Sequence, residues 1–206
     1  LIALIAVLPL ASVSAEETKF DPFEKSIREI SDALENNQIT SEQLVAYYLE
    51  RIKAYDKQGP TINSFTNINE EAIEIAKQLD AERQSKGARS VLHGIPIVVK
   101  DNFDVKGMPT TAGSVALKEA YPVKDAFTIQ KLKDAGAIII GKTNMSEFAA
   151  SYGRLGYSSL GGLTLNPYNL QRDASGSSSG TAAAVTANFG GCGLGTDTSG
   201  SVRGPS

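Results

Sequence analysis

The amino-acid sequence predicts an α/β protein, and three observations lead to that fold class. Two short β-branched runs, at residues 95–99 and 137–140, are typical of strands buried inside a parallel sheet. A segment of helical character, residues 125–133, lies between them. A strand, a helix and a second strand joined by short links predict a parallel pair with a right-handed crossover.

Three helices are expected before the first strand. Residues 24–36 and residues 70–84 place apolar side chains at helical spacing. Between them, residues 40–43 read TSEQ, which is a capping-box pattern. There the Thr40 hydroxyl is expected to accept from the amide of Gln43 and to open a helix. These helices carry no residues of obvious chemistry and are interpreted as scaffold.

Polar residues follow the first predicted strand, at residues 95–99. That strand ends at Lys100, so it is expected to deliver a lysine at one edge of the sheet. Farther along the chain, Asp125 is expected to cap the next helix and Gly136 to end it. The second strand, at residues 137–140, then begins.

Composition limits the classes of function. The chain has 206 residues, a formal net charge of −3 and 41% hydrophobic residues, so it can bury the core of one or two domains. The weakly acidic balance without a basic stripe argues against nucleic-acid binding. Cys192 is the single cysteine, so no internal disulfide forms. His93 is the single histidine, and a Ser-His-Asp triad would have to use it. A Cys192–His93 dyad is an alternative, but a structural histidine and a small buried cysteine are expected.

The first residues resemble an export signal. Residues 1–11 are an apolar run, small residues follow at 12–15, and Glu16 and Glu17 come next. This pattern predicts cleavage after Ala15, and the run is too short to cross a bilayer as a helix. The alternative is a buried N-terminal helix. The signal predicts a secreted or periplasmic protein with no stable membrane anchor after its removal, and the absence of an initiating Met indicates that the signal is partial.

Two segments rich in Gly and Ser stand out, residues 175–180 (SGSSSG) and 195–201 (GTDTSGS). Such small residues allow backbone to approach backbone or ligand closely. A helix is expected at residues 182–189, so the amides of the first segment would favour negative charge. Three interpretations remain at this point: a phosphate cradle, although GxxxxGK[ST] and GxGxxG are absent; acyl transfer by a serine; and a flexible linker.

Four segments in this order resemble the amidase signature family. They are residues 94–102 (GIPIVVKDN), 141–149 (GKTNMSEFA), 175–180 (SGSSSG) and 195–201 (GTDTSGS). The separation of 24 residues between Ser177 and Ser201 also matches that family. The resemblance runs from about Thr40 to the end of the chain, and its most specific part follows Ser175.

The resemblance implies a mixed sheet flanked by helices, the amidase signature fold, and a Ser-Ser-Lys catalytic triad. Ser201 would be the nucleophile and Lys100 the base. Ser177 would bridge them through its hydroxyl, on a peptide bond that is cis in this family. The family needs no cofactor and no metal, and its substrate is a small-molecule amide.

The same resemblance implies an oxyanion hole made by backbone amides. These would be the amides of Thr198, Ser199, Gly200 and Ser201. This sequence departs from the family at Ser175 and Ser199, where glycine is frequent. Both replacements are small, so close backbone approach is preserved.

Lys100 acts as a base only when it is neutral, and burial at a strand end lowers the pKa of a lysine. Asp101 would oppose this, but adjacent residues of a strand point to opposite faces, so Asp101 is expected to point away. Asp197 is expected to brace the oxyanion loop, and Arg203 to pair with a nearby carboxylate. Taken singly, Lys100 would be an ordinary strand-end lysine and the serines ordinary turn residues.

Family members continue far beyond Ser206. We therefore expect residues 1–15 to be a partial signal peptide and residues 16–206 to be the N-terminal, triad-bearing part of one amidase domain, with an incomplete sheet. The leading hypothesis is an exported hydrolase of carboxylic amides with an acyl-enzyme on Ser201. One alternative is the glutaminase subunit of a tRNA-dependent amidotransferase, which the export signal disfavours. Another is a non-catalytic ligand-binding module.

Overall fold

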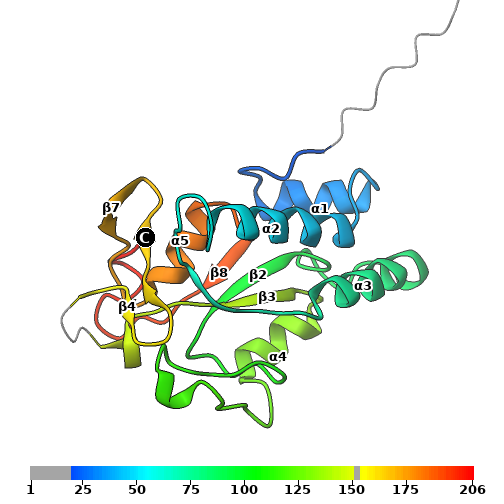
Figure 1. Ribbon diagram of the computed structural model, residues 1–206. Coiled ribbons are helices and arrows are strands. Elements are labelled where there is room, and N and C mark those ends of the chain that lie inside the picture. The colour runs from blue at the N-terminus through cyan, green and yellow to red at the C-terminus, as the bar shows by residue number, and fades with distance from the viewer. Residues whose placement is uncertain (1–19, 151–153) are drawn as a thin grey trace, which may run out of the picture.

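A four-stranded mixed sheet forms the centre of the protein (Figure 1). The structure is a computed structural model, and it describes residues 20–150 and 154–206. The strand order is β1-β3-β2-β8. Their bounds are β1 (Phe65–Ile68), β2 (Pro96–Lys100), β3 (Ile138–Thr143) and β8 (Cys192–Leu194). β2 is parallel to both β3 and β8, and β1 is antiparallel to β3. The predicted α/β class and the parallel crossover pair are confirmed.

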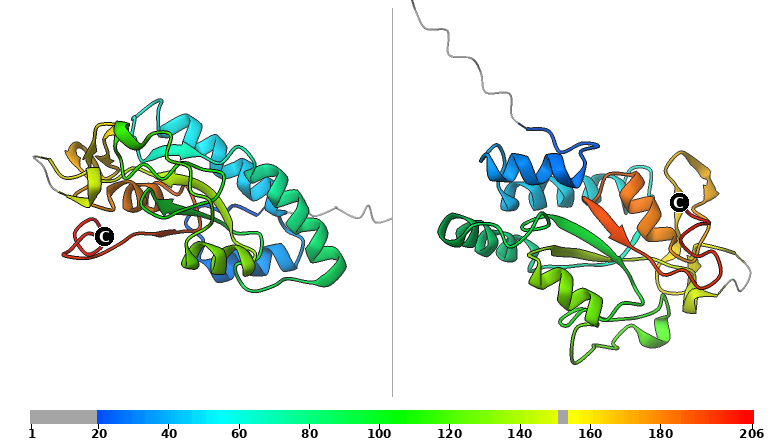
Figure 2. Two further views of the ribbon diagram at one scale, coloured as in Figure 1. Left: turned by 90° about the horizontal axis from the view of Figure 1, so that it is seen from below. Right: turned by 180° about the vertical axis from the view of Figure 1, so that it is seen from behind.

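Helices cover both faces of this sheet. They are α1 (Ile27–Glu35), α2 (Ser41–Tyr55), α3 (Ala72–Lys86), α4 (Phe127–Asp134) and α5 (Ser179–Thr186). In Figure 1, α1 and α2 lie above the sheet and α4 lies below it, and Figure 2 shows the same layers from two other sides. One core cluster joins α1, α2, α3 and α5 to Val98 and Ile140, and a second joins α4 to Ile97 and Ile139. The two clusters alternate along each strand because successive side chains point to opposite faces.

Smaller elements surround the sheet. Two short ribbons pair β4 (Tyr157–Ser158) with β5 (Gly162–Leu163), and β6 (Leu165–Asn166) with β7 (Asn169–Asp173). Two 3₁₀ turns are η1 (Val115–Leu117) and η2 (Glu147–Ala149). Within the described ranges, no helix is both long and apolar enough to cross a membrane. The predicted signal at residues 1–15 lies outside the described residues.

The capping box at the start of α2 forms as expected. The Thr40 hydroxyl accepts from the Gln43 amide at 3.1 Å, and the Gln43 side chain accepts from the Thr40 amide at 3.1 Å. The end of α4 is also as predicted, because Gly136 follows it with φ at +89°. Glycine adopts this backbone conformation without steric cost.

Three predicted helix starts are wrong. α1 begins at Ile27 and not at residue 24, because Ser26 caps it by accepting from the Glu29 amide. α4 begins at Phe127 without a side-chain cap, because the Asp125 carboxylate instead accepts from the Lys106 amide at 2.7 Å and pairs with Lys133 at 2.8 Å. α5 spans Ser179–Thr186, three residues earlier than expected. Its N-cap position is Ser178, and Asn188, whose φ is +59°, prevents it from reaching residue 189.

Candidate active site

Lys100 is placed at the edge of the sheet where the parallel strands β2, β3 and β8 all end. Its side chain is fully buried and donates hydrogen bonds from Nζ to Ser177 Oγ at 2.7 Å and to Thr196 Oγ1 at 2.8 Å. A third contact reaches the Thr196 carbonyl at 3.4 Å. The lysine therefore meets the first Gly/Ser segment through Ser177 and the second through Thr196.

Burial lowers the pKa of Lys100 to about 8, from an ordinary 10.5. The cause is the loss of hydration of the ammonium, and the Asp197 carboxylate partly opposes it. Asp101 does not, because its carboxylate is paired with the Lys142 ammonium at 2.9 Å. The predicted orientation of Asp101, away from Lys100, is confirmed.

Ser177 lies on a cis peptide bond with Gly176, as the resemblance implied. Its carbonyl accepts from the Ser146 amide at 3.1 Å, and the next amide, of Ser178, donates to the Ser201 carbonyl at 3.0 Å. Gly176 packs so closely on the Ser146 hydroxyl that a Cβ would clash with it. Both Gly/Ser segments are thus held against each other and against the end of β3.

Ser201 and Ser177 line one pocket of about 490 Å³. The apolar part of the wall is made by Ala149, Ala150 and Leu155. Among the described residues, the Ser201 hydroxyl has no hydrogen-bond partner, so the second link of the expected relay, from Ser177 to Ser201, is not present. The structure brings Lys100 and Ser177 into contact and places Ser201 beside them in the pocket.

The backbone amides of the loop before Ser201 differ in their hydrogen bonding. In the described part of the chain, the amides of Thr198, Ser199 and Ser201 donate to no protein acceptor. The fourth expected member, Gly200, donates instead to Asp197 Oδ1 at 2.6 Å. Three amides are therefore unpaired within the described residues, two of them in the pocket-lining residues Ser199 and Ser201, and the Gly200 amide is used to shape the loop.

Asp197 braces this loop, as expected, and Arg203 is its partner. Arg203 Nε and Asp197 Oδ2 are 3.0 Å apart, and the same carboxylate accepts from the amides of Val202 and Arg203. The Arg203 guanidinium and these amides hold the pKa of Asp197 well below its usual range. The loop therefore keeps an ionised carboxylate at neutral pH.

Three residues around Lys100 were not predicted from the sequence. Thr196 holds Lys100 directly, Asn102 donates to Thr196 Oγ1 at 3.0 Å, and the Ser178 hydroxyl accepts from the Thr196 amide at 3.3 Å. Thr196 and Ser178 both lie inside the Gly/Ser segments. Nothing in the sequence distinguishes their hydroxyls from their neighbours, because the contact with Lys100 spans 96 residues.

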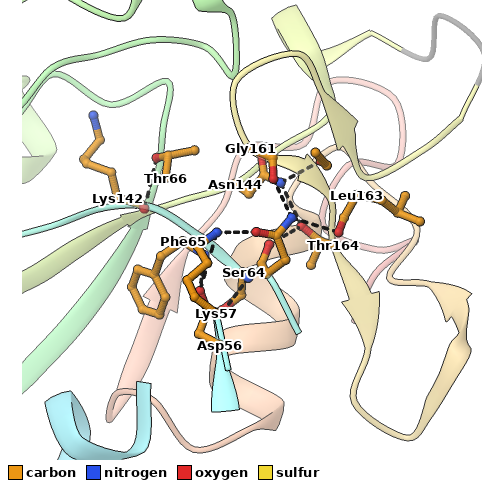
Figure 3. A network of polar contacts seen from close by, with 12 residues as sticks. Asp56, Lys57, Ser64, Phe65, Thr66, Lys142, Asn144, Gly161, Leu163 and Thr164 are labelled. Carbon is orange, nitrogen blue, oxygen red and sulfur yellow. Dashed lines mark hydrogen bonds and ion pairs between the residues drawn. The ribbon is translucent and has the colours of Figure 1, made fainter. Parts of the chain in front are cut away.

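A buried polar network surrounds the residue that follows β3 (Figure 3). Asn144 follows β3 and is fully buried; its side-chain nitrogen donates to the Gly162 carbonyl at 3.0 Å and to Thr164 Oγ1 at 3.1 Å. Its backbone amide donates to the Ser64 carbonyl at 2.7 Å, and its carbonyl accepts from Gly180 in α5. One asparagine thus connects β1, β3, α5 and the β5–β6 region.

His93 and Cys192 lie outside this arrangement. The His93 ring is buried: Nδ1 accepts from the Arg89 amide at 3.2 Å, so Nε2 carries the proton that is donated to the Leu79 carbonyl at 2.9 Å. Both ring nitrogens are occupied, which confirms a structural histidine. Burial raises the pKa of the Cys192 thiol, which disfavours the thiolate that a dyad needs.

The fold and the site define an α/β protein with a buried lysine, two serines and unpaired backbone amides at one edge of a parallel sheet. The chain belongs to the amidase family, whose model matches residues 43–206. Its expected fold class is confirmed by solved structures. The peptide amidase from Stenotrophomonas maltophilia is 38% identical with a TM-score of 0.86, over 89% of this chain and 38% of that one.

Other relatives give the same family. An amidase family protein from Bacillus anthracis is 42% identical with a TM-score of 0.83, over 87% of this chain and 36% of that one. A glutamyl-tRNA(Gln) amidotransferase subunit of Lachnoclostridium phytofermentans is 44% identical, over 86% of this chain and 35% of its own length. The chain spans about a third of the length of the curated relatives that it matches.

Proposed function

We propose that the full-length protein hydrolyses carboxylic amides through an acyl-enzyme on Ser201. The observation that carries the proposal is Lys100, a buried lysine with a pKa lowered to about 8 and a hydrogen bond of 2.7 Å to Ser177. Activated nucleophiles need an adjacent base of this kind. The small-amide substrate class follows from the family.

The proposed chemistry divides the roles among three residues. Neutral Lys100 takes a proton from the Ser177 hydroxyl, which takes one from Ser201 as Ser201 Oγ attacks the carbonyl carbon. The C–N bond then breaks, and the proton returns through Ser177 to the leaving nitrogen. Water adds to the resulting ester along the same relay, which releases the acid and restores Ser201.

The negative oxygen of each tetrahedral intermediate is stabilised by backbone amides. Thr198, Ser199 and Ser201 supply amides that have no protein partner in the described chain. The family resemblance implied a fourth amide, that of Gly200. This amide donates to Asp197 and so stabilises the conformation of the loop. Such preorganised donors are worth several kcal/mol, roughly 3–4 per donor, in related chemistry.

The test is ammonia release from a panel of simple amides by the full-length protein. Ser201→Ala is expected to lower turnover at least about 10³-fold, because the nucleophile is lost. Lys100→Ala is expected to lower it about 10²- to 10⁴-fold. Ser85→Ala, on the exposed part of α3, is the control and should leave turnover unchanged. A folded protein that releases no ammonia and is not labelled by a fluorophosphonate-type serine probe would instead be a ligand-binding module.

A second candidate is the glutaminase subunit of a tRNA-dependent amidotransferase. The glutamyl-tRNA(Gln) amidotransferase subunits that are 42% and 44% identical to this chain favour it. It predicts hydrolysis of free glutamine that rises when partner subunits are added, and co-purification with those subunits. Activity on simple amides in a preparation of this protein alone favours the first candidate.

We also propose that residues 1–15 direct export and that residues 16–206 are the triad-bearing part of one amidase domain. The apolar run followed by small residues and Glu16 supports the first statement. Expression in a secreting host, followed by mass spectrometry, should find a mature chain that starts at Glu16 outside the cytoplasm. A protein retained in the cytoplasm with residues 1–15 intact would contradict export.

A further inference from the structure

A fully buried ion pair lies directly beside the proposed base and takes no part in the proposed chemistry. Lys142 Nζ and Asp101 Oδ1 are 2.9 Å apart, and both side chains are completely shielded from solvent. Every other ion pair found in the described residues has at least one partner that is partly exposed to solvent. A pair of buried charges is costly to desolvate, so its place next to Lys100 needs an explanation.

The pair occupies the face of the sheet opposite to the catalytic face. The register of β2 and β3 sets Lys100 beside Thr143, and Thr143 Oγ1 contacts Thr181 of α5 at 2.7 Å. Lys142 precedes Thr143 and Asp101 follows Lys100. Because side chains alternate along a strand, Lys142 and Asp101 meet on the other face. In Figure 3 the Lys142 side chain extends away from the polar network around Asn144.

Asp101 ties three segments to the end of β2. Its carboxylate accepts from Thr66 Oγ1 in β1 at 3.2 Å, from the Thr111 amide at 3.3 Å and from the Thr111 hydroxyl. The Asp101 amide donates to the Thr143 carbonyl of β3 at 3.1 Å. The residue after the base is thereby held by β1, β3 and the loop that follows β2.

The two neighbouring lysines have opposite surroundings. Lys142 donates to the Pro109 carbonyl at 3.0 Å in addition to its carboxylate partner, so its charge is compensated. Within the described part of the chain, Lys100 donates only to oxygen atoms of Ser177 and Thr196, which are neutral. Burial lowers the pKa of both lysines, but among the described residues only Lys142 has a carboxylate within ion-pair distance to oppose it.

Few charged groups of the described residues act on this pair and on Lys100. Asp197, from the segment after β8, acts on Lys100, and Asp104, from the loop after β2, acts on Lys142. Asp101 and Lys142 compensate each other across the opposite face of the sheet. The hydration of Lys100 Nζ therefore depends on whether the end of β2 holds it in contact with the hydroxyl groups of Ser177 and Thr196.

We propose that the Asp101–Lys142 ion pair is a positioning element for Lys100, an inference that rests on the proposed role of Lys100 as the base. The pair clamps the ends of β2 and β3 together, which delivers Nζ to Ser177 and Thr196 and keeps water away from it. When the clamp is lost, the strand end loosens, water hydrates the ammonium, and the hydrogen bond to Ser177 lengthens.

The test uses the full-length protein and two variants of similar shape, Lys142→Met and Asp101→Asn. We expect kcat to fall about 10- to 100-fold with KM little changed, because misplacement of a catalytic group acts on the chemical step. We also expect the rising limb of the pH–rate profile to move to higher pH by about one unit, as Lys100 regains hydration. A loss of stability alone would move neither quantity.

Two further variants serve as control and as safeguard. Lys133→Met removes the ion pair with Asp125 at 2.8 Å on α4, which is partly exposed, and should leave the pH profile unmoved. Thr111→Val keeps the ion pair but removes one hydroxyl that donates to Asp101. Thr111→Val should shift the pH–rate profile in the same direction as the two charge variants, but by less. It also tests the proposal if neither charge variant folds.

A readout independent of turnover separates this inference from the proposed function. NMR titration of ¹³C-labelled lysine, with the Lys100 signal assigned through Lys100→Met, reports Lys100 directly. A Lys100 signal that titrates low in the wild type and higher in both Asp101→Asn and Thr111→Val supports the clamp even where no amide is hydrolysed, because neither variant leaves an unpaired carboxylate beside Lys100. Unchanged titration and kcat alongside a lower melting temperature would show that the pair only stabilises the fold, and would overturn the inference.

Discussion

Burial of Lys100 lowers the stability of the folded protein and makes the side chain a better proton acceptor. An ammonium that is fully buried among neutral oxygen atoms is destabilised relative to water, which brings the pKa to about 8. The same burial supplies a fraction of neutral amine near physiological pH that an ordinary lysine lacks. The features that weaken the folded state at this residue are those that suit it to accept a proton.

The pH dependence of activity follows from this residue. Because only neutral Lys100 accepts the proton, kcat/KM should rise with pH and level off above about 8, the pKa of the group. A pH–rate profile of amide hydrolysis that brackets this pKa by about two units on each side measures the rise. A profile that is flat across that range would remove Lys100 from the role of base.

Replacing the lysine should stabilise the protein. Lys100→Met removes a group whose pKa falls from 10.5 to about 8 on folding, so the gain is at most about 3 kcal/mol below pH 8. A lowered lysine pKa means that the folded state binds fewer protons, so wild-type stability rises as pH increases from about 8 to 10.5. The gain of the variant should therefore shrink over that window in urea unfolding experiments. A gain that does not change with pH would point to packing instead.

At the scale of single elements, the contact of α5 with the ends of β1 and β3 positions Ser177. Gly180, in the first turn of α5, lies against the carbonyl oxygens of Ser64 and Asn144, and its amide donates to Asn144 at 2.9 Å. A side chain there would force the helix away from the sheet. Because Ser177 lies just before α5, its distance from Lys100 depends on this close contact.

Gly180→Ala tests this contact. We expect a loss of about 1–3 kcal/mol of stability from overpacking, together with a fall in kcat as Ser177 moves. Val185→Ala, on the half-exposed side of the same helix, is the matched control and should have a smaller effect on both. Urea unfolding gives the stability of both variants, and steady-state kinetics gives their kcat. Equal effects of the two substitutions would contradict the packing argument.

At the scale of the whole molecule, Arg51 of α2 joins distant parts of the fold. Its guanidinium donates to the Ala187 carbonyl at 2.9 Å and to the Asn188 carbonyl at 3.0 Å, at the end of α5. It also lies 5.0 Å from the ring centre of Phe23, which precedes α1. One side chain therefore satisfies helix-end carbonyls and holds the N-terminal segment against the helical layer.

Arg51→Met should lower stability by about 1–3 kcal/mol, because two carbonyls lose a charged donor. The site lies elsewhere, so the rising limb of the pH–rate profile should not move. Lys53→Met, an exposed change in the same helix, is the control and should be nearly neutral. A shift of the pH profile in Arg51→Met would show that the helical layer is coupled to Lys100.

Local features of the sequence determined much of this protein. The capping box at Thr40, the helix stop at Gly136 and the parallel strand pair depend on neighbouring residues and on periodicity, and these predictions are confirmed. The place of Lys100 at a strand end was also predictable. The alternation of side chains along a strand correctly predicted that Asp101 points away from Lys100. Such features are readable because they involve residues close together in the chain.

Only the tertiary structure decided which distant groups meet. Thr196 reaches Lys100 across 96 residues, and Lys142 compensates Asp101 from another strand. Asp125 binds the Lys106 amide 19 residues away instead of capping α4. Each outcome depends on the register of strands and on the path of loops, and many polar side chains offer the same donors and acceptors. The pattern of residue types therefore predicted the site, while packing over long separations selected the partners that tune it.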